Sequence, residues 1–167
     1  MTATKNLILE DGQVRQKIRR MAYEIFENNF DEKVIVIAGI DGQGYALAKL
    51  LGKEVTSISP LKVVTVKVLM DKATPEKSEV TLDMDVDDFR KKTILLVDDV
   101  LNSGRTLAYG MKPFLSIEVK KIEVAVLVNR SHPVFPVHPN YTGYELSTTL
   151  REHVTVVLGE KSAVYLD

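Results

Sequence analysis

Short apolar runs alternate with amphipathic stretches through the middle of this chain. Residues 34–39 (VIVIAG), 94–97 (ILLV) and 122–128 (IEVAVLV) are almost wholly apolar, which is typical of strands buried on both faces of a sheet. Residues 61–70 alternate between apolar and polar side chains instead. Apolar residues at helical spacing fill the intervals between the runs. This order predicts an α/β fold, with a doubly wound, mostly parallel sheet and helices on both of its faces.

Two helices can be bounded from the sequence. The first precedes the first apolar run, and we expect Asp11 to be its N-cap and residues 28–29 to end it. Its apolar face consists of Val14, Ile18, Met21, Ala22, Ile25 and Phe26. The second helix follows residue 106, and Pro113 is expected to shorten or kink it because proline cannot donate a backbone hydrogen bond.

The remaining segments predict two smaller additions to the sheet. Residues 71–79 are polar and precede a possible short returning strand at 79–83, which indicates a flexible hairpin or lid. Short strand-like pieces follow near Tyr144, at 153–158 and at 163–166, and they indicate a small C-terminal hood. The length of 167 residues and the absence of a linker predict a single domain over residues 1–167.

Composition narrows the function classes. Hydrophobic residues make up 45% of the chain and charged residues 27%, as in ordinary soluble proteins. A net charge of −1 excludes attraction of nucleic acid by bulk charge. A local basic strip, either a solvated helix face or a phosphate- or RNA-binding surface, consists of Arg15, Lys17, Arg19 and Arg20. The chain has no cysteine, which excludes disulfides and thiol catalysis. Neither a cleavage-site pattern nor an apolar stretch of membrane-spanning length is present, so we expect a cytoplasmic protein without membrane contact.

The most informative stretch is residues 93–106, TILLVDDVLNSGRT, in which a buried strand leads to an acidic pair and a small turn. The backbone N–H groups of the turn and of the following helix start can face an anion, and Gly104 allows close approach. The carboxylates of Asp98 and Asp99 can accept hydrogen bonds from sugar hydroxyls. The stretch therefore predicts a site for a phosphorylated sugar; an acidic strand end that merely caps the next helix would explain fewer of its residues.

A second turn follows the first buried strand and consists of Asp41, Gly42, Gln43 and Gly44. A strand, a glycine-rich turn and a helix together suggest a dinucleotide site. The glycines at 39, 42 and 44 do not have the G-x-G-x-x-G spacing, however, and this disfavours that interpretation. The open alternatives are a turn whose backbone amides bind an anion and a tight turn that needs glycine only for its conformation.

Residues 94–106 resemble the phosphoribosyl pyrophosphate (PRPP) motif of the type I phosphoribosyltransferases: four apolar residues, two acids, two apolar residues and a Ser-Gly-x-Thr loop. The resemblance extends over nearly the whole chain. The segments ILEDGQVRQKIRRMAYEIFENN and VLVNRSHPVFPVHPNYTGYELSTT are similar to the bifunctional pyrimidine-operon attenuator/uracil phosphoribosyltransferases. In purine enzymes of the family an acid usually occupies the slot of Asn102, so the asparagine favours a pyrimidine.

The resemblance implies transfer of a phosphoribosyl group from PRPP to a nucleobase, most readily uracil, with release of pyrophosphate. Asp98 and Asp99 would hold the ribose hydroxyls, and Arg130 would face the base or the pyrophosphate, or else pair with a neighbouring carboxylate. The 5′-phosphate would be bound by Asn102, Ser103, Gly104, Arg105 and Thr106. Pyrophosphate would be bound by Asp41, Gly42, Gln43 and Gly44, beneath a lid that carries Lys72 and Lys77. Mg²⁺ would be carried by PRPP, with Asp98 and Asp99 as its nearest protein groups.

Three features separate this chain from the family pattern. The pyrophosphate turn lacks a basic residue, the lid lacks arginine, and apolar residues 133–137 follow Arg130-Ser131-His132. Two alternatives to the enzyme therefore stay open: an RNA-binding transcription attenuation regulator that senses nucleotides, and an inactive PRPP sensor. A homodimer or higher homo-oligomer is expected, and residues 133–137 could cover the base or form a subunit contact. His132, His138 and His153 are not spaced as metal ligands and are interpreted as structural.

Overall fold

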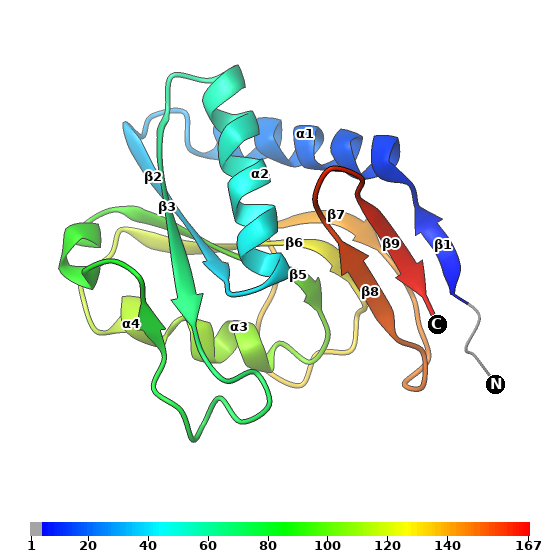
Figure 1. The fold of residues 1–167 in the computed structure, drawn as a ribbon. Helices are drawn as coiled ribbons and strands as arrows, with labels where there is room; N and C mark the ends of the chain where they lie inside the picture. The colour runs from blue at the N-terminus through cyan, green and yellow to red at the C-terminus, as the bar shows by residue number, and fades with distance from the viewer. Residues whose placement is uncertain (1–4) are drawn as a thin grey trace.

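The computed structural model describes residues 5–167, and a six-stranded sheet with helices on both faces is its central feature (Figure 1). The strand order is β4-β3-β2-β5-β6-β7, and all neighbours run parallel except β4, which is antiparallel to β3. These strands are β2 (Val34–Ile40), β3 (Lys62–Leu69), β4 (Thr81–Leu82), β5 (Thr93–Leu101), β6 (Lys121–Asn129) and β7 (Tyr141–Glu145). The predicted α/β class and mostly parallel sheet are confirmed.

Strands β2 and β3 end near the same level of the sheet, and β5 continues beyond them to Leu101 beside β6. Gly39 of β2 lies opposite Lys67 of β3 on one side and Val97 of β5 on the other. In open parallel sheets, ligands bind beyond the carboxyl ends of such strands. The 41–44 turn therefore begins beside the acidic pair of β5, whereas the 102–106 loop follows the end of that strand.

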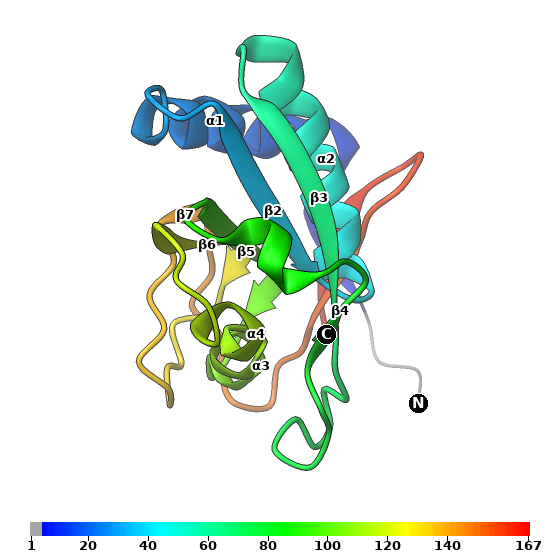
Figure 2. The ribbon, with the colours of Figure 1, turned by 90° about the vertical axis from the view of Figure 1, so that its left-hand side faces the viewer.

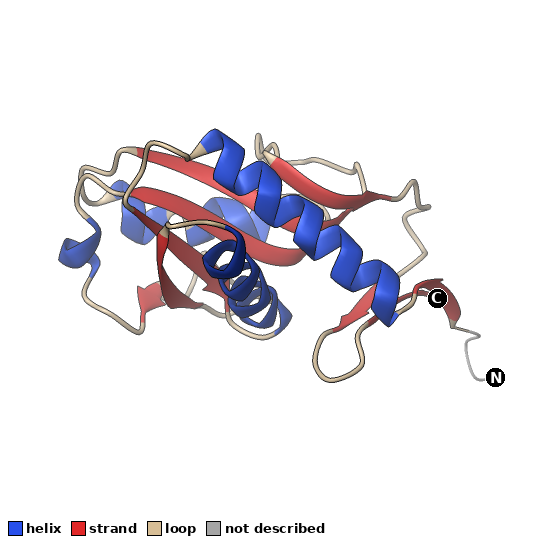
Figure 3. Cartoon of the chain, turned by 90° about the horizontal axis from the view of Figure 1, so that it is seen from above, coloured by secondary structure: helices blue, strands red, loops and turns tan. Residues whose placement is uncertain are grey.

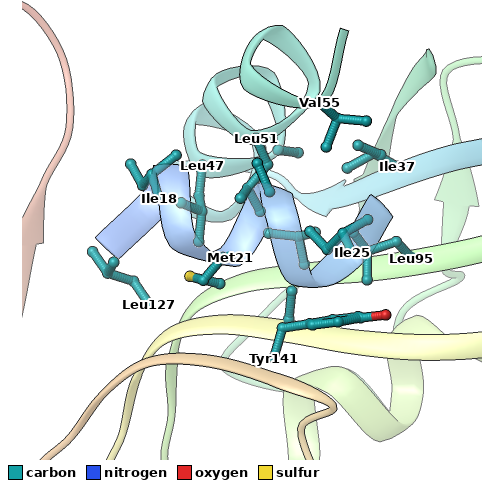
Figure 4. Close-up of a cluster of buried hydrophobic side chains, with 14 of the residues drawn as sticks. Ile18, Met21, Ile25, Ile37, Leu47, Leu51, Val55, Leu95, Leu127 and Tyr141 are labelled. Atoms are coloured by element: carbon teal, nitrogen blue, oxygen red, sulfur yellow. The ribbon is translucent and has the colours of Figure 1, made fainter. Parts of the chain in front are cut away.

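One face of the sheet is covered by α1 (Asp11–Asn28) and α2 (Gln43–Ile58), which cross it as Figures 1 and 3 show. In Figure 4, Met21 and Ile25 of α1 and Leu47 of α2 point toward the sheet. Their sheet partners in the same buried cluster include Ile37, Leu95, Leu127 and Tyr141. The apolar face predicted for the first helix is thus its buried face, except that Phe26 is only partly buried.

The opposite face is covered by shorter helical pieces: the 3₁₀ turn η1 (Val86–Phe89), α3 (Arg105–Gly110) and α4 (Lys112–Leu115) (Figure 2). Leu107, Phe114 and Phe89 pack there against sheet residues such as Leu96, and the rings of Phe89 and Phe114 lie 6.3 Å apart. The helix after residue 106 breaks at Gly110 and resumes with Pro113 in its first turn. Pro113 therefore shortens this helix, as predicted.

The start of α1 differs from the prediction by one residue. Glu10, with an extended backbone (ψ 173°), is the N-cap, and Asp11 is already helical. The Glu10 N–H donates to the Gln13 side chain over 2.9 Å, so a side chain within the helix satisfies this group. Asp11 instead accepts a 2.7 Å hydrogen bond from the Ser162 N–H, which ties α1 to the C-terminal part of the chain.

The hood is a separate three-stranded antiparallel sheet in the order β1-β9-β8, formed by β1 (Asn6–Leu9), β8 (Val154–Val157) and β9 (Ala163–Leu166). The sequence analysis did not predict β1, because a four-residue strand has no clear pattern and its partner lies at the far end of the chain. The piece around Tyr144 belongs to the main sheet as β7, not to the hood. Within residues 5–167, no helix has the length and apolar character needed to cross a lipid bilayer.

Candidate active site

A cavity of about 440 Å³ lies at the carboxyl end of β5. It is bounded by three parts of the chain: the acidic pair with the loop after it, the lid, and strand β8. The lining residues are Lys72, the continuous run 98–107, and 153–156. The acids and the small turn, selected from sequence as a sugar-phosphate site, therefore border one hollow.

Asp98 and Asp99 lie inside β5 and not beyond it. The sequence predicted a strand at 94–97, but pairing with β6 continues to Leu101 opposite Asn129. Asp98 is only 4% exposed, and its Oδ1 accepts a 2.9 Å hydrogen bond from the Asp99 N–H. Burial, and then the neighbouring charge of Asp99, raise the pKa of Asp98 to about 8, while Lys72 opposes the shift. Asp98 is therefore a carboxyl group that readily gains a proton.

The loop after the acids is supported from behind. Gly104 has a left-handed backbone (φ 86°), which glycine adopts without strain, and α3 begins directly after it. The carbonyl of Ser103 accepts hydrogen bonds from the N–H groups of Val134 and Phe135, each 2.9 Å long. A Cβ on Gly104 would lie 3.2 Å from Val137 Cβ. Residues 133–137 thus pack behind the predicted phosphate loop, and the wall opposite the loop is β8.

Arg130 is buried and makes hydrogen bonds in two directions. Its Nη1 donates to Asn102 Oδ1 over 2.8 Å, and its Nε donates to Thr148 Oγ1 over 2.9 Å. Its Nη2 donates to the carbonyls of Thr149 and Glu152. Arg130 is absent from the cavity lining, so its guanidinium holds the 102–106 loop and the segment before β8 in position. The partners are an amide, a hydroxyl and carbonyls, not the carboxylate considered from sequence.

The 41–44 turn adjoins the cavity without lining it. Gly42 (φ 98°) is the N-cap of α2, and Gly44 packs so closely that a Cβ there would lie 2.8 Å from Asp98 Oδ1. Gln43 Oε1 accepts a 2.9 Å hydrogen bond from the Leu158 N–H at the end of β8. The turn therefore connects the acidic pair to the hood.

The lid loop contacts the site through two ion pairs. Lys72 Nζ lies 3.6 Å from Asp98 Oδ1, and Glu76 pairs with Arg105 of the 102–106 loop. Lys77, the second lysine predicted to act in the lid, is exposed and is not part of the cavity lining. Glu76 was missed from sequence because an acid in a polar loop carries no sign of its partner.

Strand β8 was recognised only as a strand-like piece, and its place at the cavity was missed. His153 and Asp167 exchange both backbone hydrogen bonds, 2.7 and 2.9 Å long. Because such pairs alternate in antiparallel sheets, the N–H and C=O groups of Val154 and Val156 point away from β9, toward the free edge of the hood. Both residues line the cavity, as does His153, which had been interpreted as structural. His132 contacts Thr148, its Nε2 lying 2.8 Å from that carbonyl.

Several side chains of the basic strip on α1 contact other groups of the same chain. Arg15 Nε lies 2.9 Å from Asp11 Oδ2, and Arg20 Nη2 donates to the Gly143 carbonyl over 2.7 Å. Lys17 Nζ lies 5.8 Å from the centre of the Tyr144 ring. The contacts of Arg20 and Lys17 therefore connect α1 to β7, whereas the Arg15 ion pair lies within α1.

Comparisons with known proteins identify the family. Residues 6–159 match the model of the phosphoribosyl transferase domain. "Bifunctional protein PyrR" of Microcystis aeruginosa is 32% identical over 164 residues, which is 92% of this chain and 90% of that protein. The protein of the same name from Clostridium kluyveri is 33% identical over 168 residues, covering 93% and 92%.

Solved structures show the same fold at lower identity. The hypoxanthine phosphoribosyltransferase of Trypanosoma cruzi has a TM-score of 0.77 and 12% identity, with 95% of each chain covered. A hypoxanthine-guanine phosphoribosyltransferase from Bacillus anthracis has a TM-score of 0.74 and 18% identity, covering 87% of this chain and 85% of its own. Since the family model matches most of the sequence and relatives exceed 30% identity over nine-tenths of it, this chain belongs to the type I phosphoribosyltransferases.

Proposed function

We propose that this phosphoribosyltransferase transfers the 5-phosphoribosyl group of PRPP to uracil and releases pyrophosphate. The observation that carries the proposal is a single cavity shared by the acidic pair, the 102–106 loop and the free edge of β8. The cavity would accommodate PRPP and a base in this order: the loop would bind the 5′-phosphate, the acids would bind the ribose, and the hydrogen-bonding edge of β8 would bind the base.

The acidic pair suits a reaction in which the ribose becomes cationic. Two carboxyls can grip the ribose hydroxyls and offset the positive charge that develops as pyrophosphate leaves. Since the pKa of Asp98 is raised to about 8, the approach of PRPP with its cation would favour the ionised form. The base nitrogen then bonds to the anomeric carbon, the carbon–oxygen bond to pyrophosphate breaks, and the proton of that nitrogen leaves to water or to the departing pyrophosphate. The chain contributes positioning and electrostatics and needs no nucleophile of its own.

Two features support a pyrimidine with an amide-like edge. Val154 and Val156 offer backbone donors and acceptors at the cavity, and these can pair with the alternating N–H and C=O groups of uracil. Asn102 Oδ1 already accepts a 2.8 Å hydrogen bond from Arg130 Nη1, so this oxygen is engaged within the protein. Purine enzymes of the family usually have an acid at the position of Asn102, and this chain has none there.

Magnesium is proposed to enter with PRPP. Hard oxygen ligands are available from Asp98 and Asp99, but within residues 5–167 no three His, Cys, Asp or Glu side chains gather into a metal site. A pair of acids fits an ion held chiefly by pyrophosphate and ribose oxygens, where it would neutralise the leaving group. Asp98 and Asp99 would contact it through those hydroxyls or through water.

The direct test measures pyrophosphate release from PRPP and Mg²⁺ with uracil, and in parallel with hypoxanthine and guanine. We expect release with uracil and a loss of PRPP binding in the Asp98→Asn, Asp99→Asn double variant with the fold retained. Release with purines only would refute the uracil assignment. Unchanged PRPP affinity in the double variant would refute the sugar site.

The word "bifunctional" in the name of the relatives keeps the regulatory alternative under test. An RNA-binding regulator would bind RNA with an affinity that falls as salt rises, because released counterions drive such binding. An inactive sensor would bind PRPP and release no pyrophosphate. The same assay, with an RNA titration at two salt concentrations, separates these three functions.

A further inference from the structure

The side chain of Gln43 is bound to the hood. Gln43 is the first residue of α2, and its Oε1 accepts a 2.9 Å hydrogen bond from the Leu158 N–H, directly after β8. The start of α2 and the end of β8 therefore lie side by side (Figure 1). Gln43 is partly buried at this contact and is not part of the cavity lining. Its side-chain oxygen is thus already engaged by the protein.

The partner of Gln43 belongs to the edge of β8 that borders the cavity. The N–H and C=O groups of Val154 and Val156 point away from β9, and the backbone groups of a strand repeat their direction every second residue. The Leu158 N–H therefore continues the same row. Two residues of a strand span about 7 Å. Gln43 thus holds the free edge of β8 one step beyond the groups that we propose to meet the base.

The turn that carries Gln43 is fixed to the main sheet. The Asp41 N–H donates to the Val68 carbonyl over 2.9 Å, at the end of β3. On the other side of the turn, a Cβ on Gly44 would lie 2.8 Å from Asp98 Oδ1. Strand β8 pairs only with β9 within the hood. The hydrogen bond of Gln43 therefore links the element that contacts Asp98 directly to the strand that forms the opposite cavity wall.

We propose that Gln43 is a positioning residue for the nucleobase, which acts by holding β8 at a fixed place relative to the acidic pair. The assignment rests on the proposed function, because the base is the part of the substrates that would meet β8. Transfer requires the base nitrogen to lie close to the anomeric carbon, so a small displacement of this wall is costly. Gln43 acts through β8 and does not contact pyrophosphate.

Calorimetric titration with uridine 5′-monophosphate, the product of the proposed transfer, and with ribose 5-phosphate tests the role of Gln43. The two ligands differ by the base, so the ratio of their affinities measures the base contact alone. We expect Gln43→Met, which keeps the side-chain length but loses the oxygen, to weaken uridine 5′-monophosphate binding roughly three- to tenfold. The affinity for ribose 5-phosphate should not change. Gln43→Glu should restore the ratio, because a carboxylate oxygen can accept from the Leu158 N–H.

Gln13→Met is the matched control. Gln13 Oε1 accepts a hydrogen bond of the same length, 2.9 Å, from the Glu10 N–H at the start of α1. Gln13 is not part of the cavity lining. The two methionine variants should therefore have similar thermal midpoints, whereas only Gln43→Met should weaken the binding of uridine 5′-monophosphate.

Three results would overturn the role of Gln43. These are equal affinities for uridine 5′-monophosphate in Gln43→Met and Gln13→Met, a loss in Gln43→Met that is as large for ribose 5-phosphate, and weaker binding of magnesium pyrophosphate with the base contact unchanged. A parallel titration with inosine 5′-monophosphate separates this inference from the proposed function. If the unaltered chain bound only this purine nucleotide and Gln43→Met weakened it, the role of Gln43 would stand and the uracil assignment would fail. Binding of neither nucleotide nor ribose 5-phosphate would overturn both.

Discussion

Replacing Asp98 by asparagine should make the protein more stable while it abolishes PRPP binding. Asp98 is almost fully buried, and its pKa is raised from 3.8 to about 8 by burial and then by Asp99. At neutral pH the unfolded chain gains by ionising this carboxyl and the folded chain does not. Asparagine removes that difference and keeps an oxygen that can accept from the Asp99 N–H.

The size of the effect follows from the shift. A difference of about 4 pKa units corresponds to a ceiling of roughly 5 kcal/mol, at 1.36 kcal/mol per unit, and the attraction to Lys72 is already contained in that shift. Relaxation of the site reduces the effect, and we expect a gain of about 2 kcal/mol. For a chain of this size that is a rise of about 4–8 °C in Tm.

The dependence on pH distinguishes this cause from others. The folded-state pKa lies above the unfolded one, so the penalty is absent below about pH 4, grows as pH rises, and is constant above about pH 8. The Tm difference between Asp98→Asn and the unaltered chain should grow over the same range. Asp88→Asn, at an exposed acid in η1, is the control and should change Tm little. A destabilised Asp98→Asn variant, or a gain that does not vary with pH, would refute the reasoning.

Three further substitutions test the lid, the 41–44 turn and the hydrogen bonds of Arg130. Glu76→Gln frees Arg105 from its ion pair and should raise PRPP affinity two- to threefold, the scale of an exposed pair; an unchanged affinity by calorimetry would mean that Glu76 does not compete with phosphate. Gly44→Ala places a Cβ 2.8 Å from Asp98 Oδ1 and should weaken PRPP binding at least tenfold, whereas unaltered binding would show that the contact relaxes without consequence. Arg130→Met leaves Asn102 and two carbonyls without their donor and should lower the free energy of unfolding by about 3 kcal/mol. Arg130→Lys should restore little of this stability, since an ammonium cannot span these acceptors. A thermal midpoint equal to that of the unaltered chain would contradict the stabilising role of the Arg130 hydrogen bonds.

The sequence predicted well what depends on local pattern. Buried runs located β2, β5 and β6, and the alternation of 61–70 located β3, because side-chain period reflects burial directly. The turn after Leu101 was predicted because glycine, hydroxyl-bearing residues and a helix start are adjacent in the sequence. A shorter helix after residue 106 was predicted because the ring of Pro113 removes a backbone hydrogen-bond donor, and α3 ends at Gly110.

Contacts between distant segments were beyond such reasoning. The β1–β9 pairing joins opposite ends of the chain, and the exposure of the β8 edge depends on which side of β8 is paired. Arg130 was expected near the base or pyrophosphate, yet its partners are Asn102 and residues 148–152, which only the folded tail brings near. Lys67 looked like one polar position in an alternating strand until register placed it beside Asp41.

The hood has a practical consequence for handling this protein. Its strands β1 and β9 come from the two extremities of the described chain, and through β9 they hold β8 against the cavity. A fusion partner or surface anchor attached near either extremity would pull on the cavity wall at which we propose that the nucleobase binds. Affinity for the base, more than affinity for PRPP, is therefore the quantity that would report such mechanical disturbance.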